Sequence, residues 1–145
     1  MKKLFVTTLI AISFITTAFA GETKLSYAIL SNFKTQFKNA SDINWITNEA
    51  YAKATFIENQ IKMEAFYSPA GELIGTSKGI TLDQLSVKAK RNFAKKYGEY
   101  SVTEAIRFEG IEEAAYYIAA RNEQETVVVK VSDDNQISII KRTKL

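Results

Sequence analysis

Apolar residues recur at every third or fourth position in two segments of the chain, residues 23–39 and 81–97. The apolar residues are Leu25, Ile29, Phe33 and Phe37 in the first segment and Leu82, Leu85, Ala89, Phe93 and Tyr97 in the second. This spacing places one stripe on one side of a helix, so each segment predicts an amphipathic helix. Residues 81–84 have the form of a capping box, and Gly98 follows the second stripe, which predicts a helix that begins at Thr81 and ends in a left-handed glycine.

Each predicted helix is followed by four short segments that are typical of strands. They cover residues 43–45, 51–57, 61–67 and 73–76 in the first half, and residues 100–109, 114–121, 125–131 and 136–141 in the second half. Turn-type residues separate most of them. The sequence therefore predicts an α+β fold, in which two α-β-β-β-β repeats form an antiparallel sheet with both helices packed on one face.

The two halves also correspond residue by residue. Phe33 and Phe37 match Phe93 and Tyr97 at an offset of 60, and residues 58–60 match residues 122–124 at an offset of 64. An internal repeat explains this correspondence, although two unrelated meanders could produce the same order of features. We therefore expect one domain over residues 21–145, with repeat halves at about 23–80 and 81–145.

Strand alternation assigns the side chains to two faces. The face expected to meet the helices contains Ala52, Ala54, Phe56, Ile61, Met63, Ala65, Val102, Ile106, Phe108, Ala114, Tyr116, Ile118, Val127, Val129, Val131, Ile137 and Ile139. The opposite face is expected to be open and to bind a partner, chiefly through Tyr51, Lys53, Phe66, Arg107, Tyr117, Arg121, Lys130 and Arg142. Aromatic area beside cations suits an acidic protein surface, with Tyr117 as the first candidate anchor. The alternative is a solvated face on which Lys and Arg stems cover the aromatic rings.

The first twenty residues have the three parts of a secretory signal peptide. Lys2 and Lys3 precede an apolar run, and Ala18-Phe19-Ala20 gives a small-x-small ending. The run is short and contains hydroxyl groups, which argues against a membrane anchor. We therefore predict cleavage after Ala20 and a periplasmic or secreted protein without a membrane anchor.

Composition excludes several classes of function. The chain of 145 residues has no Cys and no His, which removes thiolate nucleophiles, imidazole bases and the usual zinc ligand sets. Without Lys2 and Lys3, 17 cations face 16 acids, so no positive excess favours nucleic acid. The acid pairs at Glu112-Glu113 and Asp133-Asp134 are expected to solvate turns. We therefore predict no enzyme activity, no cofactor and no metal.

Several motifs in this order resemble a known family. They are Phe33-x3-Phe37-x-Asn39-Ala40-x2-Ile43-x-Trp45, then Tyr67-x-Pro69-x-Gly71-Glu72-Leu73, then Lys96-Tyr97 at the end of the second helix, and the Asp133-Asp134-Asn135 turn. This layout resembles the PepSY-like proteins, small exported bacterial proteins frequent in Bacteroidetes with the fold of the beta-lactamase inhibitory protein (BLIP-like). The resemblance covers about residues 25–142.

The resemblance implies binding or inhibition of another protein outside the cytoplasm, and it implies no catalytic residue. The inhibitory protein has disulfides, which this chain cannot form, so its inhibitory residues are not carried over. Trp45, the single Trp, is a further candidate anchor, or else it closes the end of the core. A periplasmic carrier of a small ligand and an enzyme without a recognisable motif remain as alternatives.

Overall fold

A computed structural model describes residues 24–145 of the chain. The predicted signal peptide and its cleavage site lie outside these residues. Within this range, none of the helices is long and apolar enough to cross a membrane.

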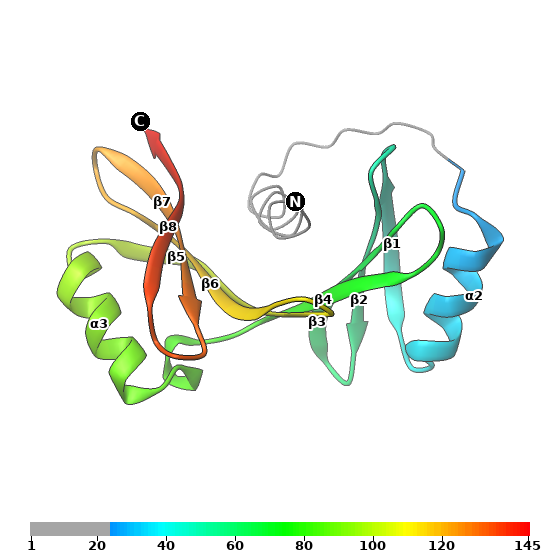
Figure 1. The fold of residues 1–145 in the computed structure, drawn as a ribbon, viewed down its shortest axis with the longest axis horizontal. Helices are drawn as coiled ribbons and strands as arrows, with labels where there is room; N and C mark the ends of the chain where they lie inside the picture. The colour runs from blue at the N-terminus through cyan, green and yellow to red at the C-terminus, as the bar shows by residue number, and fades with distance from the viewer. Residues whose placement is uncertain (1–23) are drawn as a thin grey trace. The chain divides into compact units, whose positions relative to one another are not determined.

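Two compact units make up the described part of the chain, residues 24–78 and 79–145. The first contains α2 (Tyr27–Gln36), β1 (Ser41–Thr47), β2 (Ala52–Glu58), β3 (Ile61–Tyr67) and all but the last residue of β4 (Leu73–Gly79). The second contains a 3₁₀ turn (Leu82–Gln84), α3 (Val87–Tyr97), β5 (Ser101–Gly110), β6 (Ala114–Arg121), β7 (Glu125–Ser132) and β8 (Ile137–Lys144). Figure 1 shows one helix and its strands in each unit.

The predicted fold class is confirmed. Each unit is a helix followed by four strands that pair antiparallel with their neighbours in chain order, so the fold is α+β and built from two α-β-β-β-β repeats. Within each unit the helix packs on one face of its strands, which we call the helix face; the opposite side is the second face. This packing follows from the single apolar stripe on each helix.

Both helices begin at a serine, and these serines are 60 residues apart. The Ser26 hydroxyl accepts a hydrogen bond from the Ile29 N–H at 3.3 Å, and the Ser86 hydroxyl accepts one from the Ala89 N–H at 3.0 Å. The predicted start at Thr81 was wrong, because residues 82–84 form a separate 3₁₀ turn and Thr81 makes no side-chain cap. Serine at these positions satisfies an N–H group that the first helical turn leaves unpaired.

Gly98 ends α3, but it does not do so in the predicted conformation. Its φ of −64° lies in the right-handed region, so the predicted left-handed stop was wrong. A Cβ atom at this position would lie 2.6 Å from the Ala94 carbonyl oxygen. Close approach of the backbone therefore accounts for the glycine.

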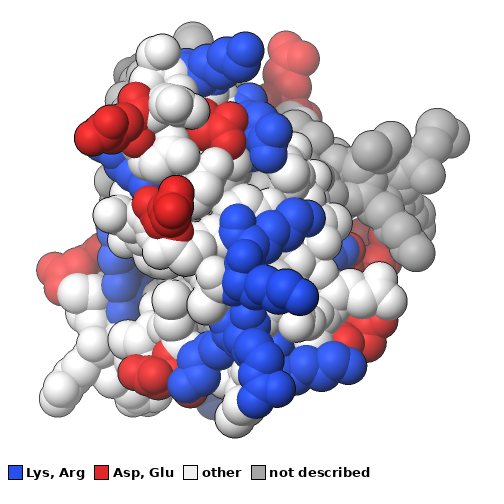
Figure 2. Space-filling view, turned by 90° about the vertical axis from the view of Figure 1, so that its left-hand side faces the viewer, with Lys and Arg blue, Asp and Glu red and all other residues white. Residues whose placement is uncertain are grey.

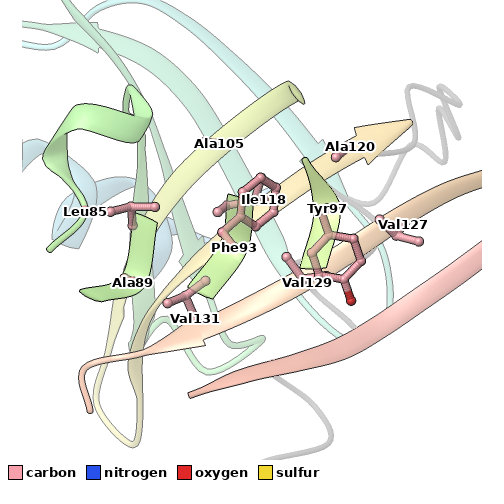
Figure 3. Close-up of a cluster of buried hydrophobic side chains, with 10 residues drawn as sticks. All are labelled: Leu85, Ala89, Phe93, Tyr97, Ala105, Ile118, Ala120, Val127, Val129 and Val131. Carbon is pink, nitrogen blue, oxygen red and sulfur yellow. The ribbon is translucent and has the colours of Figure 1, made fainter. Parts of the chain in front are cut away.

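Each unit has its own core on the helix face. In the first unit, the Phe33 ring lies 5.0 Å from the Phe56 ring and 5.1 Å from the Trp45 ring, with edge contacts. Figure 3 shows the core of the second unit, where Phe93 and Tyr97 of α3 lie over Ile118 and Val129. These buried apolar side chains supply the main stabilisation of a chain without disulfides.

Irregularities in β5 and β8 overturn part of the predicted face assignment. The β5–β6 register shifts between Val102 and Glu104, so Thr103 is an extra residue and the alternation reverses after it. Ile106 and Phe108 consequently lie opposite Tyr117 and Ala115 on the second face, and the prediction that they meet α3 was wrong.

The same reversal moves two predicted partner-binding residues. Arg107 pairs with Tyr116 on the helix face rather than with the Tyr117 face. In β8 a register shift leaves Ile140 as the extra residue, so Arg142 pairs with the core residue Val127. The predicted placement of Arg107 and Arg142 beside Tyr117 was therefore wrong.

Three residues predicted for the core are exposed at the edges of the strands. The exposed fractions are 47% for Ile61, 37% for Val102 and 42% for Ile139. Ile61 begins β3 beside a turn, and Ile139 lies on β8, which ends the meander of its unit. The alternation at Ile61 and Ile139 is that of a core strand, but neither residue has a paired strand on both sides, so both stay exposed.

Candidate partner-binding face

Six of the predicted partner-binding residues lie on the second face of their own unit, three in each unit. Lys53 of β2 lies opposite Phe66 of β3, and the Tyr51 ring is 6.2 Å from the Phe66 ring. In the other unit, Tyr117 of β6 lies opposite Lys130 of β7. Arg121 follows Tyr117 on the same side of β6 by alternation.

The aromatic residues of this face are buried. Tyr51 is 6% exposed, Phe66 1% and Tyr117 0%. The sequence predicted exposed anchors at these positions, and the structure places them inside the protein instead. Ile106 and Phe108 on the same face of β5 are also buried. The central strands are therefore apolar on both sides, as is typical of fully buried strands.

In the first unit, Glu64 organises the polar part of the face. The Lys53 ammonium lies 2.9 Å from one Glu64 oxygen, and the Ser77 hydroxyl donates a hydrogen bond of 3.1 Å to the other. The Lys53 and Glu64 side chains are largely buried, and Ser77 is buried. A charge in such a position needs a close partner, which explains why these residues come from three neighbouring strands.

In the second unit, Glu113 has the same role. One of its oxygens lies 2.5 Å from the Lys130 ammonium, and the other accepts a hydrogen bond from the Tyr117 hydroxyl. Burial raises the pKa of Tyr117 well above its ordinary value, and the bond to Glu113 adds to this effect. Tyr117 therefore stays protonated and holds the carboxylate in place.

The Glu64 cluster and the Glu113 cluster are related by the internal repeat, but the lysine and the aromatic residue have exchanged strands. At an offset of 64, Lys53 corresponds to Tyr117 and Phe66 corresponds to Lys130. Each unit thus places one lysine opposite one aromatic residue in the middle of its second face. In both units a glutamate neutralises that lysine.

Arg107 forms a separate cluster on the helix face. Its guanidinium lies 2.6 Å from Asp133 and 4.6 Å from the centre of the Tyr116 ring. The hydrogen bond from Arg107 lowers the pKa of Asp133, and the same bond raises the pKa of Arg107. The Asp133 turn, which the sequence analysis assigned to solvation, is thus tied to β5.

Arg142 belongs to another cluster on the helix face. Its Nε lies 3.4 Å from Glu125, whose other oxygen accepts a 2.7 Å hydrogen bond from the Tyr100 hydroxyl. This bond to Glu125 raises the pKa of Tyr100. Arg142 therefore has a role in the packing of its own unit.

Trp45 and Arg121 lie in different settings. Trp45 packs against the first core, next to Phe33 and Tyr67, so its ring closes the end of that core. Arg121 is exposed at the end of β6. Arg121 is thus accessible to solvent, whereas Lys53 and Lys130 of the same faces are largely buried.

Glu113 was not predicted as a member of this face, although a signal was present. Glu113 directly precedes β6 and continues the alternation of Ala115 and Tyr117, so the alternation that placed Tyr117 also places Glu113 there. The exposed apolar residues Ile46 and Ile57 were missed too. Each is 37% exposed, and they lie opposite Lys53 and Lys62 on the second face of β1 and β2.

Residues 24–145 contain no group of three or more Asp or Glu side chains that could hold a metal ion. The polar groups brought together on the second face are a lysine, a glutamate and a hydroxyl in each unit. This arrangement suits charge pairing, because each carboxylate oxygen already accepts a contact from its own unit.

Comparison with known proteins identifies the fold. No family model matches the chain, and no curated protein is similar to it in sequence. Solved structures do match. A candidate periplasmic protein from Bacteroides eggerthii DSM 20697 has a TM-score of 0.74 and 16% identity, covering 84% of this chain and 90% of its own.

Two further structures have the same layout. A BLIP-like protein from Bacteroides fragilis NCTC 9343 has a TM-score of 0.70 at 16% identity, with 86% of this chain and 89% of that chain covered. A DUF2874 family protein from Bacteroides ovatus ATCC 8483 has a TM-score of 0.72 at 18% identity, with the same coverages of 86% and 89%. The chain therefore has the BLIP-like fold. At these sequence identities, the roles of individual residues cannot be transferred from the solved structures to this chain. The resemblance to PepSY-like proteins stays a prediction.

Proposed function

We propose that this chain is an exported, non-enzymatic protein that binds another periplasmic or secreted protein through the second face. The observation that carries the proposal is a pair of exposed apolar side chains, Ile46 and Ile57, on the second face of the first unit. The helix of each unit packs on the helix face, while the second face carries aromatic, aliphatic and paired charged side chains. Side chains of this kind are typical of protein interfaces.

The corrected face assignment changes which residues make the contact. Buried Phe66 and Tyr117 hold the strands and the charged pairs in place. The groups available to a partner are exposed Ile46 and Ile57 in the first unit and exposed Arg121 in the second. In the first unit, Lys53 lies between Ile46 of β1 and Phe66 of β3, where its pair with Glu64 would fix the orientation of a partner.

Two similarities to other proteins support a role in protein binding. The fold is shared with a protein described as BLIP-like, and the PepSY-like resemblance implies small exported proteins that bind other proteins. Export itself follows from the predicted signal peptide, and one structural neighbour is described as a candidate periplasmic protein. Inhibition of a partner would be a special case of such binding.

The experiment compares two faces of the same unit. The protein is used to capture a partner from periplasmic extract, and the purified partner is then titrated against three forms of the protein: the unaltered chain, the double variant Ile46→Arg/Ile57→Arg, and Ile61→Arg. Ile61 is 47% exposed and lies on the helix face of β3, so it is a matched control.

We expect the double variant to weaken binding by about tenfold or more, because charge would be buried at the contact. The Ile61→Arg variant should bind like the unaltered chain. Equal weakening by both variants, no weakening by the double variant, or an extract that yields no partner would contradict the proposal.

A further inference from the structure

Helix α3 carries a concentration of positive charge that α2, the other α-helix among residues 24–145, does not share. Its eleven residues include five cations, Lys88, Lys90, Arg91, Lys95 and Lys96, and no acid. Four of these cations are exposed. Figure 2 shows Lys and Arg side chains gathered on the side of the molecule that carries α3. By comparison, α2 contains a single lysine.

Most of this charge is not neutralised within residues 24–145. Lys90 pairs with Asp83 at 3.2 Å, but none of the ion pairs in this part of the chain involves Lys88, Arg91, Lys95 or Lys96. Like charges on one helix repel each other, which costs stability. An external anion would relieve that repulsion.

A groove beside α3 collects three of these lysines. It has a volume of about 710 Å³ and lies between the helix and the hairpin that joins β7 to β8. Its lining residues are Lys88, Asn92, Lys95 and Lys96 from the helix and Asp134, Asn135, Gln136 and Ile137 from the hairpin. Three cations thus face one acid across the groove.

Specific hydrogen bonds fix the shape of the groove. The Ser86 hydroxyl donates to the Asn135 side chain, and the Asn92 side chain donates to the Asn135 carbonyl at 3.3 Å. Asn135 has a φ of 69°, a left-handed conformation that Asn tolerates better than most residues. The hairpin is therefore held against α3 at Asn135, one of the residues that line the groove.

We propose that this groove binds an acidic segment of a partner protein. The lysines would pair with Asp or Glu side chains of the segment. The amides of Asn92 and Gln136 would hydrogen-bond to its backbone, as they can both donate and accept. A volume of about 710 Å³ suits several residues of an extended chain.

The chemistry of the groove favours an acidic peptide over a phosphate group or a lipid surface. Its cations are all lysines, whereas Arg91, with the fork that suits phosphate, does not line it. One large apolar side chain of α3, Val87, is exposed, which is little for insertion into a bilayer.

The test uses a fluorescent oligoglutamate peptide as the probe and follows its anisotropy. The variant Lys88→Glu/Lys95→Glu should weaken binding by about tenfold or more at low salt, because two attractive charges become repulsive. The control Lys34→Glu/Lys38→Glu reverses two exposed lysines around the C-terminus of α2 and should leave affinity within about twofold.

A third variant gives an effect of opposite sign. Asp134→Asn removes the acid of the groove and can still accept the hydrogen bond from Ser132, so it should tighten binding severalfold. Raising the ionic strength from about 20 mM to about 200 mM should weaken binding of the unaltered protein severalfold. Circular dichroism of each variant confirms that it is folded.

Three results would overturn the proposal. One is no measurable binding of the peptide at low salt. Another is equal loss in the α2 control, and the last is tighter binding of inorganic phosphate or phosphatidylglycerol vesicles than of the peptide. The Ile46→Arg/Ile57→Arg variant should bind the peptide normally, so failure here is distinguishable from failure of the proposed function.

Discussion

The second face and the outer surface of α3 both carry lysines, but they hold them in opposite ways. On the second face, Lys53 and Lys130 are largely buried, and each lies next to a glutamate. On α3, Lys88, Lys95 and Lys96 are exposed, and no ion pair within residues 24–145 neutralises them. A buried charge must have a partner in its own protein, whereas an exposed charge is solvated by water and remains available to an external partner.

The difference matters for the nature of the partner. The sequence predicted an acidic partner for the sheet because five of the predicted partner-binding residues are cations. Two of these, Arg107 and Arg142, lie on the helix face, and two others are neutralised by Glu64 and Glu113. The excess of positive charge lies on α3 instead. An acidic partner is therefore better matched to the groove beside that helix than to the sheet.

The largest expected effect is the removal of the Glu113 carboxylate. Glu113→Ala would leave both the Lys130 ammonium and the Tyr117 hydroxyl without their acceptor, so we expect a loss of about 2–4 kcal/mol in the free energy of unfolding. Urea denaturation measures it. Glu123→Ala, at an exposed loop position, is the control and should change stability by less than about 0.5 kcal/mol. Equal effects would mean that the Glu113 pair is not structural.

Glu64 should show the same behaviour at a smaller scale, because its cluster contains a serine in place of the buried tyrosine. We expect Glu64→Ala to lower the free energy of unfolding by about 1–2 kcal/mol. A double-mutant cycle with Lys53→Ala should give a coupling energy of about 1 kcal/mol. Strict additivity of the two substitutions would contradict a direct interaction between Lys53 and Glu64.

The α3 lysines should respond differently. Lys88→Ala and Lys95→Ala should each change the free energy of unfolding by less than about 0.5 kcal/mol, since exposed cations without a partner add little. Thermal or urea unfolding of the single variants checks this. A loss comparable to that of Glu64→Ala would show that these lysines have structural partners.

The smallest effect concerns the acid stability of the Arg107–Asp133 pair. The pKa of Asp133 is lowered in the folded state, so the ionised carboxylate stabilises the folded protein. This contribution to the free energy of unfolding is present above the ordinary aspartate pKa near 4 and is lost as the pH falls through the lowered pKa. Asp133 is 63% exposed, which limits the contribution to about 0.3 kcal/mol. Asp133→Asn should therefore flatten the acid side of a stability profile slightly. A steeper acid limb in this variant would contradict the assignment.

Much of the fold could be predicted because its signals are local. The four-residue spacing of Ile29, Phe33 and Phe37 and the alternation in β2 and β6 are read directly from sequence. The extra residues Thr103 and Ile140 were invisible, since bulges are set by pairing with the neighbouring strand. Each bulge reversed the alternation beyond it, which is why Arg107 and Arg142 were placed on the wrong face.

The candidate site could be predicted only in part for a related reason. Alternation identified the second face, but it could not show that Phe66 and Tyr117 are buried, because burial depends on what packs over a strand. The cations of α3 are plain in the segment from Val87 to Tyr97. In the sequence, this segment was interpreted only through its apolar stripe. The groove could not be predicted, because its other wall is a hairpin about forty residues later in the chain.

The most direct test of the central claim is lysine-resolved acylation of the native protein, followed over time by mass spectrometry. An amine that is buried and paired reacts slowly because it must lose its partner and reach the reagent. We expect Lys88, Lys95 and Lys96 to react at least about tenfold faster than Lys53 and Lys130, and Glu64→Ala to speed the reaction of Lys53. Similar rates for all five lysines, or protection of the α3 lysines, would contradict the contrast between the two regions.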